Sequence, residues 1–141
     1  MQAEKRKLAR LHRLERLRAI AKQAAASEAA RAEATLSQLA LLAERTGQLA
    51  ADYAARTDAE DGAALGRIGR FAGSLQGLRA ATEADVSRAR AIADERQSQL
   101  ATAERRRAAV EDRAEAQARQ LAARRHYAVL AGRRGFGTKL D

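Results

Sequence analysis

The strongest structural signal in the chain lies in residues 82–121, which read TEADVSRARAIADERQSQLATAERRRAAVEDRAEAQARQL. Written as heptads, and continued backwards to residue 65, the stretch has two repeated positions rich in small or apolar residues. One position holds Leu65, Ala72, Val86, Ala93, Leu100, Ala114 and Leu121, and the other holds Ile68, Leu75, Thr82, Ala89, Ala103 and Val110. Two such positions in every heptad are typical of a helix that packs along one seam against another helix.

Polar residues interrupt this seam at intervals. They are Arg79, Arg96, Arg107, Gln117 and Arg124. Because a charged side chain packs poorly between two helices, the seam is predicted to be weak and able to adapt to a partner.

The composition favours long helices over a globular core. Of 141 residues, 38 are Ala, and there is no Pro and no Cys. Alanine is the best helix former, and without proline nothing forces a helix to break. Large apolar residues are few, so we expect a thin seam of Leu and Ala.

The first half of the chain predicts one helix over about 3–56. Apolar residues recur at helical intervals, first as Leu8, Leu11, Leu14, Leu17 and Ile20, then as Leu36, Leu39, Leu42, Leu49 and Tyr53. A break follows at about 57–62, where Thr57 and Glu60 have the spacing of a capping box. This places the second helix at about 58–130. A competing start at Thr82 would give three helices.

We therefore predict a single all-α domain over residues 1–141, a long antiparallel two-helix coiled-coil hairpin. Two helices of such length bury their seams most economically by pairing about the turn. Residues near 5–10 should then lie opposite residues near 110. Residues 131–141 should form a flexible tail.

The charges are unevenly distributed. Residues 1–18 carry a net charge of +5, residues 105–141 carry +6, and residues 19–104 carry −2. A hairpin would bring both basic ends together into one pole that attracts an acidic partner. The alternative is a mixed-charge surface that only keeps the protein in solution.

Five glycines, at 62, 66, 69, 73 and 77, follow helical spacing on one face of the second helix. Together they should cost a free helix on the order of 4–5 kcal/mol relative to alanine. The stripe is either a docking face, where another backbone approaches closely, or a flexible stretch.

No constellation typical of an enzyme is present, so we expect a non-enzymatic protein with no metal and no cofactor. His12 and His126 stand apart from other metal-ligating residues, and the chain has no phosphate-binding loop. Met1–Leu17 lacks the apolar run of a secretory signal, and no stretch is long and apolar enough to span a membrane. Nucleic acid is not expected as a partner, because acidic residues are interleaved and aromatic residues are few.

The layout resembles the flagellar FliJ family, whose relatives include the YscO-type stalk proteins of injectisomes. The resemblance covers most of the chain and includes the basic, Leu-rich opening over residues 8–17, the central turn, and a second helix rich in Arg, Glu and Gln. The sharpest local match is the series Phe71, Leu75, Leu78 and Thr82, in which Leu78 and Thr82 stand where the family has Ala and His.

The resemblance implies a stalk or adaptor of the flagellar type III protein export apparatus. Such a protein links the hexameric export ATPase to the cytoplasmic domain of the membrane export gate, and export chaperones are further candidate partners. It would be cytoplasmic, at the inner face of the membrane at the flagellar base. ATPase contact is expected at Arg6, Arg10, Arg13, Arg105, Arg106, Arg113 and Arg119, and gate contact at Phe71, Leu75, Leu78 and Thr82.

Several alternatives stay open at this point. Phe71 and Leu75 could belong to the intramolecular seam instead of a gate contact. The protein could serve an injectisome instead of a flagellum. It could also be a basic helical nucleic-acid-binding protein, or a generic coiled-coil scaffold.

Overall fold

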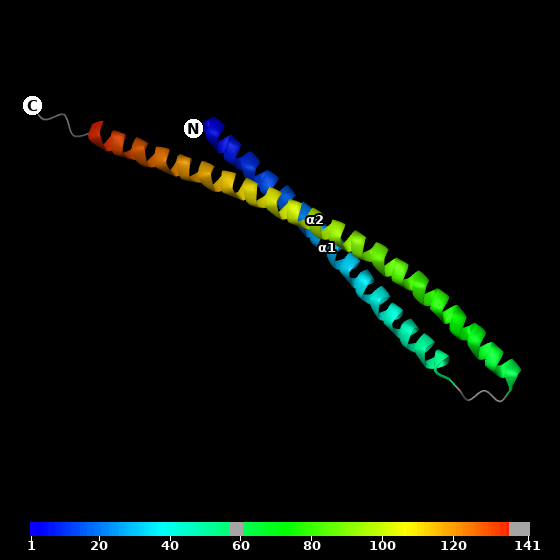
Figure 1. Ribbon diagram of the computed structural model, residues 1–141. Helices are drawn as coiled ribbons and strands as arrows, with labels where there is room; N and C mark the ends of the chain where they lie inside the picture. Colours follow the sequence, from blue (N-terminus) through cyan, green and yellow to red (C-terminus); the bar gives the residue numbers. More distant parts are fainter. Residues whose placement is uncertain (57–60, 136–141) are drawn as a thin grey trace, which may run out of the picture. The chain divides into compact units, whose positions relative to one another are not determined.

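A computed structural model describes residues 1–56 and 61–135, and these residues form two long helices (Figure 1). Helix α1 spans Gln2–Ala54 and helix α2 spans Gly62–Gly135. The described residues contain no strand. The predicted all-α class, two long helices packed as a hairpin, is confirmed.

The helix ends differ in detail from the prediction. The carboxylate of Asp61 caps α2, because its Oδ1 accepts a hydrogen bond of 2.7 Å from the backbone N–H of Ala64. The predicted capping pair, Thr57 and Glu60, lies outside the described residues. At the other end α2 continues to Gly135, so residues 131–135 are helical. The three-helix alternative is wrong, because α2 runs unbroken through Thr82.

The chain divides into two compact units, each formed by one part of α1 and one part of α2. Unit 1 comprises Met1–Ala25 and Leu100–Asp141, and unit 2 comprises Ala26–Gln99. The two units are described separately.

In unit 2, small residues dominate the seam. From α1, Ala29, Thr46 and Ala50 are buried, and from α2 the buried residues are Leu75, Thr82, Ala89 and Ala93. The α2 residues occupy the two heptad positions read from the sequence. Small side chains let two helices approach closely, so this seam is narrow as well as apolar.

The seam of unit 1 mixes apolar and charged side chains. Val110, Ala114, Gln117 and Leu121 of α2 are buried. Opposite them, half-buried α1 positions include Leu8 and Leu11 but also Glu4, Glu15, Arg18 and Lys22. Charged side chains at half-buried seam positions are therefore concentrated in unit 1.

Four large apolar residues of the α1 pattern lie outside the seam. Leu17 and Ile20 are exposed, as are Leu42 and Leu49. A stripe with an interval of three residues winds around a helix of 3.6 residues per turn, so its members leave the seam after one or two turns. Alanine and threonine occupy the seam instead.

The predicted register between the helices was also wrong. In unit 1 Glu4 pairs with Arg124, and a groove is lined by Leu11 together with Gln117, so residues 4–11 lie opposite residues near 117–124. In unit 2 Tyr53 meets Phe71. The first residues of α2 therefore extend past the end of α1, which shifts the pairing away from a symmetric fold about the turn.

The glycine stripe is helical and faces no other part of the described chain. No glycine has a positive φ. A Cβ built on Gly62, Gly69, Gly73 or Gly77 would meet no atom within 4 Å, and on Gly66 it would meet only Arg70 of the same helix. Close approach of α1 is therefore not the reason for these glycines.

Candidate interaction surfaces

Unit 1 concentrates the positive charge of the protein. Over its full sequence it holds 18 Lys or Arg against 7 Asp or Glu, a net charge of +11. Unit 2 holds 9 against 11, a net charge of −2. The pairing of the two ends of the chain produces this contrast, because each end alone carries only about half of the excess.

Seven exposed arginines of unit 1, which we call the basic pole, are the residues expected to contact an acidic partner. They are Arg6, Arg10, Arg13, Arg105, Arg106, Arg113 and Arg119. Within residues 1–56 and 61–135, none of the seven pairs with a carboxylate, although Arg105 donates a hydrogen bond of 3.2 Å to Thr102 Oγ1. Their charge is therefore available to a partner.

Three carboxylates of unit 1 contact side chains outside the basic pole. Glu4 pairs with Arg124 across the two helices, and Arg107 Nε lies 3.1 Å from Glu111 Oε1. His12 Nδ1 lies 3.6 Å from Glu15 Oε2. Exposed pairs of this kind contribute little to stability, but they remove negative charge that would otherwise neutralise the basic pole.

The four residues expected to contact the export gate lie on two different faces of α2. Leu75 is 6% exposed and Thr82 is 3% exposed, so both belong to the seam of unit 2. The Thr82 hydroxyl donates a hydrogen bond of 2.8 Å to the carbonyl oxygen of Leu78. Phe71 and Leu78 are 45% and 53% exposed. A partner could reach the second pair without opening the helices.

Phe71 is held in place by an aromatic contact that the sequence did not reveal. Its ring meets that of Tyr53 edge to face, with centroids 4.6 Å apart and an interplanar angle of 72°. The guanidinium carbon of Arg56 lies 4.8 Å from the centroid of the Tyr53 ring. Tyr53 was predicted as an apolar residue of the first helix, but only the register shows that it faces Phe71.

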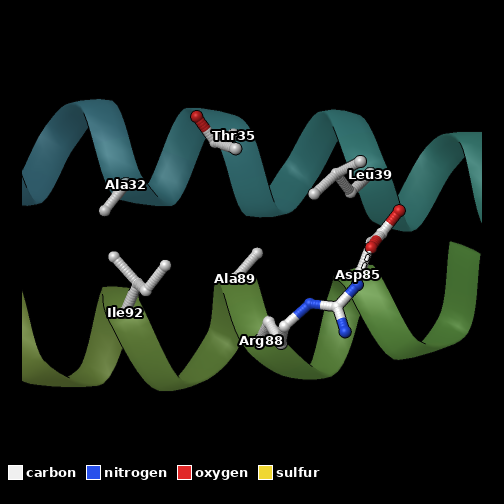
Figure 2. A pocket seen from close by; sticks show the side chains of 7 residues that line it. All are labelled: Ala32, Thr35, Leu39, Asp85, Arg88, Ala89 and Ile92. Carbon is white, nitrogen blue, oxygen red and sulfur yellow. Dashed lines mark hydrogen bonds and ion pairs between the residues drawn. The ribbon is translucent and has the colours of Figure 1, made fainter.

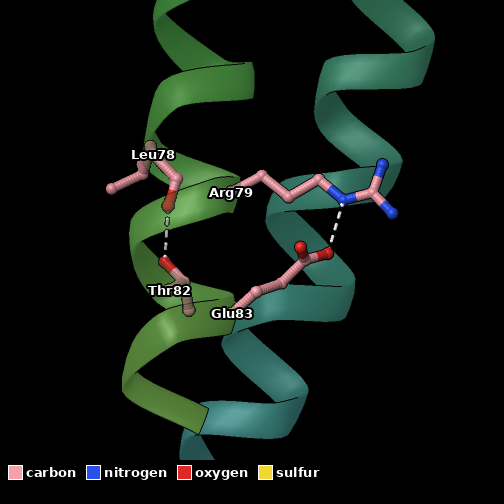
Figure 3. A network of polar contacts seen from close by, with 4 residues as sticks. All are labelled: Leu78, Arg79, Thr82 and Glu83. Atoms are coloured by element: carbon pink, nitrogen blue, oxygen red, sulfur yellow. Dashed lines mark hydrogen bonds and ion pairs between the residues drawn. The ribbon is translucent and has the colours of Figure 1, made fainter. Parts of the chain in front are cut away.

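The Arg79 side chain, which interrupts the seam of α2, is accommodated beside Gly47 of α1. Figure 3 shows the Arg79 side chain extending across α1, and its Nε lies 3.0 Å from Glu83 Oε1. A Cβ on Gly47 would come within 3.3 Å of that Nε. The absence of a side chain at Gly47 leaves room for the arginine.

In the described part of the chain, no group of three or more His, Cys, Asp or Glu residues is arranged to hold a metal ion. None of the helices over residues 1–56 and 61–135 is long and apolar enough to cross a membrane.

The comparisons with known proteins give no relative. No protein-family model, no curated protein and no solved structure matches the chain. The interaction surfaces must therefore be interpreted from their own chemistry.

Proposed function

We propose that this protein is a non-enzymatic stalk or adaptor of a type III protein export apparatus, which links a hexameric export ATPase to the export gate in the membrane. The observation that carries the proposal is the basic pole. A hairpin with a net charge of +11 in unit 1 suits an acidic site, because complementary charge steers the approach and fixes the orientation of a partner.

The arginines of the basic pole would make the ATPase contact. Arginine presents a planar fork of donors that matches carboxylates, and these side chains are exposed without carboxylate partners of their own. A partner that supplies carboxylates would gain charge-assisted hydrogen bonds and would break none of the ion pairs described above.

The gate contact is proposed for Phe71 and Leu78 alone. Leu75 and Thr82 support this contact indirectly, since they hold the seam beneath it. Replacing Phe71 and Leu78 together with alanine should reduce export and motility while the protein stays helical. Normal export by that double variant would contradict the gate assignment.

The proposal is tested by titrating the export ATPase of the same cell with this protein and measuring ATP hydrolysis. Stimulation that saturates near one chain per hexamer is expected. The informative variant reverses three charges of the basic pole, Arg6→Glu, Arg10→Glu and Arg13→Glu, and should abolish the stimulation.

A matched control keeps the overall charge the same. It reverses three exposed arginines of unit 2, Arg67→Glu, Arg70→Glu and Arg90→Glu, and should stimulate hydrolysis like the original protein. Equal loss in both triple variants would show that only net charge matters. Absence of both stimulation and co-elution with the unmodified protein would refute the stalk proposal.

The charge of unit 1 would also attract nucleic acid, and this is the competing candidate. Binding to a phosphate backbone falls steeply as salt rises, because each neutralised phosphate releases counterions. The two candidates separate in one experiment. A duplex DNA of arbitrary sequence should bind only at low salt if the protein is a stalk, whereas a nucleic-acid-binding protein would retain the DNA at physiological salt.

A further inference from the structure

We propose that unit 2 binds a second copy of this chain through an apolar surface on one side of the helix pair. We call this surface the outer strip. It consists of Leu42 and Leu49 of α1 together with Phe71, Leu78 and Ile92 of α2, and none of these residues belongs to the basic pole.

The outer strip follows directly from the heptad register. In α1 the seam positions include Ala43 and Ala50, and Leu42 and Leu49 immediately precede them. In α2 the seam positions include Ala72 and Ala93, and Phe71 and Ile92 immediately precede these. Because the two helices are antiparallel, the residues before Ala43 and Ala50 in α1 lie on the same side of the seam as the residues before Ala72 and Ala93 in α2.

A groove in unit 2 confirms that these flanking positions share one side. It has a volume of about 460 Å³ and is lined by Ala32, Thr35, Leu39, Asp85, Arg88, Ala89 and Ile92. Thr35 occupies the same heptad position in α1 as Leu42, and Asp85 and Ile92 occupy the same position in α2 as Leu78. Figure 2 shows the side chains that line the groove, with Thr35 on α1 and Asp85 and Ile92 on α2, and Asp85 forms an ion pair with Arg88.

The opposite side of unit 2 is polar. Its corresponding heptad positions are Glu33, Ala40, Gly47, Gln76, Glu83, Arg90 and Gln97. A groove on that side is lined by Glu44, Gln48, Arg79 and Glu83 among others. In a monomeric hairpin both sides of the seam would face water, so an apolar surface on one side would not contribute to its stability.

The area of the outer strip suits a modest interface. Its five side chains are between 44% and 54% exposed. At about 150–200 Å² for each free side chain, they leave about 400–500 Å² of apolar surface in each copy. A stable dimer buries about 800 Å² on each partner, so the apolar strip would supply roughly half of that and a polar rim the remainder.

A second copy is the occupant that this surface fits best. The net charge of unit 2 is only −2, so two copies would repel each other weakly there, whereas two copies of unit 1 at +11 each would repel strongly. The residues outside the strip carry both signs, with Arg45 and Asp52 on α1 and Glu95 on α2, and a two-fold axis lets opposite signs meet. Two hairpins packed in this way cover the outer strip of each copy and form a four-helix bundle.

The test measures the mass of the full chain by sedimentation equilibrium over a range of concentrations. The unmodified protein should form a dimer. The variant Leu42→Glu with Ile92→Glu places a carboxylate at two points of the strip in each copy, and should weaken the dimer by at least about 100-fold, because every change counts twice in a symmetric interface. Phe71 and Leu78 are left intact in this variant. Because the dimer would cover both residues, the proposed gate contact belongs to the monomer.

The control variant adds the same charge to the polar side, as Ala40→Glu with Gln97→Glu, and should dimerise like the original protein. Both variants should keep the helical circular dichroism spectrum, since all four sites are exposed. A protein that stays monomeric up to its limit of solubility would refute the proposal, as would equal weakening by both variants. The charge reversals in the ATPase titration test the basic pole of unit 1 and not the outer strip of unit 2, so a failure of this inference is separate from a failure of the proposed function.

Discussion

Two leucines three residues apart on α2 should differ sharply in their contribution to stability. Leu75 is 6% exposed in the seam of unit 2, and Leu78 is 53% exposed on the outer strip. Full burial of a leucine side chain contributes about 1.5–3 kcal/mol, and truncation to alanine adds the cost of any cavity that remains. A two-helix seam is thin and can partly collapse, so Leu75→Ala should lower the free energy of unfolding by about 2–3 kcal/mol.

Leu78→Ala should cost much less. About half of this side chain already contacts water, and alanine is the better helix former, so the loss should stay below about 1 kcal/mol. Because the two variants remove the same atoms from the same helix, each serves as the control for the other.

The assay is urea unfolding followed by circular dichroism, at the lowest practical protein concentration so that self-association contributes least. With a slope of about 2 kcal/mol per molar urea, Leu75→Ala should lower the midpoint by about 1 M, and Leu78→Ala by less than about 0.5 M. The slopes should agree with that of the original protein. A cost for Leu78→Ala equal to or larger than that for Leu75→Ala would refute the assignment of Leu75 to the seam and of Leu78 to the outer face.

Three further predictions test other features of the helices. Gly69→Ala and Gly73→Ala should each stabilise the protein by up to about 1 kcal/mol, because each Cβ would enter open space; an unchanged or lower melting temperature would count against this. A double-mutant cycle with Tyr53→Ala and Phe71→Ala should give a coupling energy of about 0.5–1.5 kcal/mol, and simple additivity would mean that the ring contact is not formed in solution. Arg18→Leu should raise the free energy of unfolding by about 1–3 kcal/mol, since Arg18 Nε is buried with no hydrogen-bond partner. A lower melting temperature for this variant would contradict the prediction.

The sequence predicted α2 better than α1, for a physical reason. In α2 the two seam positions carry mostly Leu, Ile, Val, Ala or Thr, with interruptions at Arg79, Arg96, Arg107, Gln117 and Arg124, so the heptad repeat could be recognised from the sequence. In α1 alanine occurs both in the seam and on the surface. The large apolar residues that drew attention, Leu17 and Ile20, are exposed. Because alanine is common both in the seam and on the surface of α1, the spacing of the large apolar residues does not identify the seam.

The clustering of charge could be predicted, but the exact pairing of the helices could not. Any hairpin that folds near its centre brings the two basic ends together. The register depends on how far the first residues of α2 extend past the end of α1, and the structure shows this where Tyr53 meets Phe71 and where Glu4 pairs with Arg124. The sequence contains no signal for that offset.

The division of the four expected gate residues was already implicit in the heptads. Leu75 and Thr82 are seven residues apart and share a seam position, and Phe71 and Leu78 share the position beside it. The resemblance to the family series suggested that all four residues form one patch, whereas the helical periodicity places them on two faces of α2. Leu42 and Leu49 of α1 also lie beside the seam, but this follows from the burial of Thr46 and Ala50 in the structure.

The contrast between the two seams has a consequence for local opening. In unit 1, Arg18 and Lys22 take half-buried positions that alanine and leucine occupy in unit 2, and the basic pole adds mutual repulsion. Amide protons of unit 1 should therefore exchange with solvent faster than those in the seam of unit 2, since they need a smaller free energy of opening. A polyanion that binds only the closed pair stabilises it in proportion to its concentration relative to its dissociation constant. Binding of such a partner and closure of the two helices of unit 1 are then thermodynamically coupled.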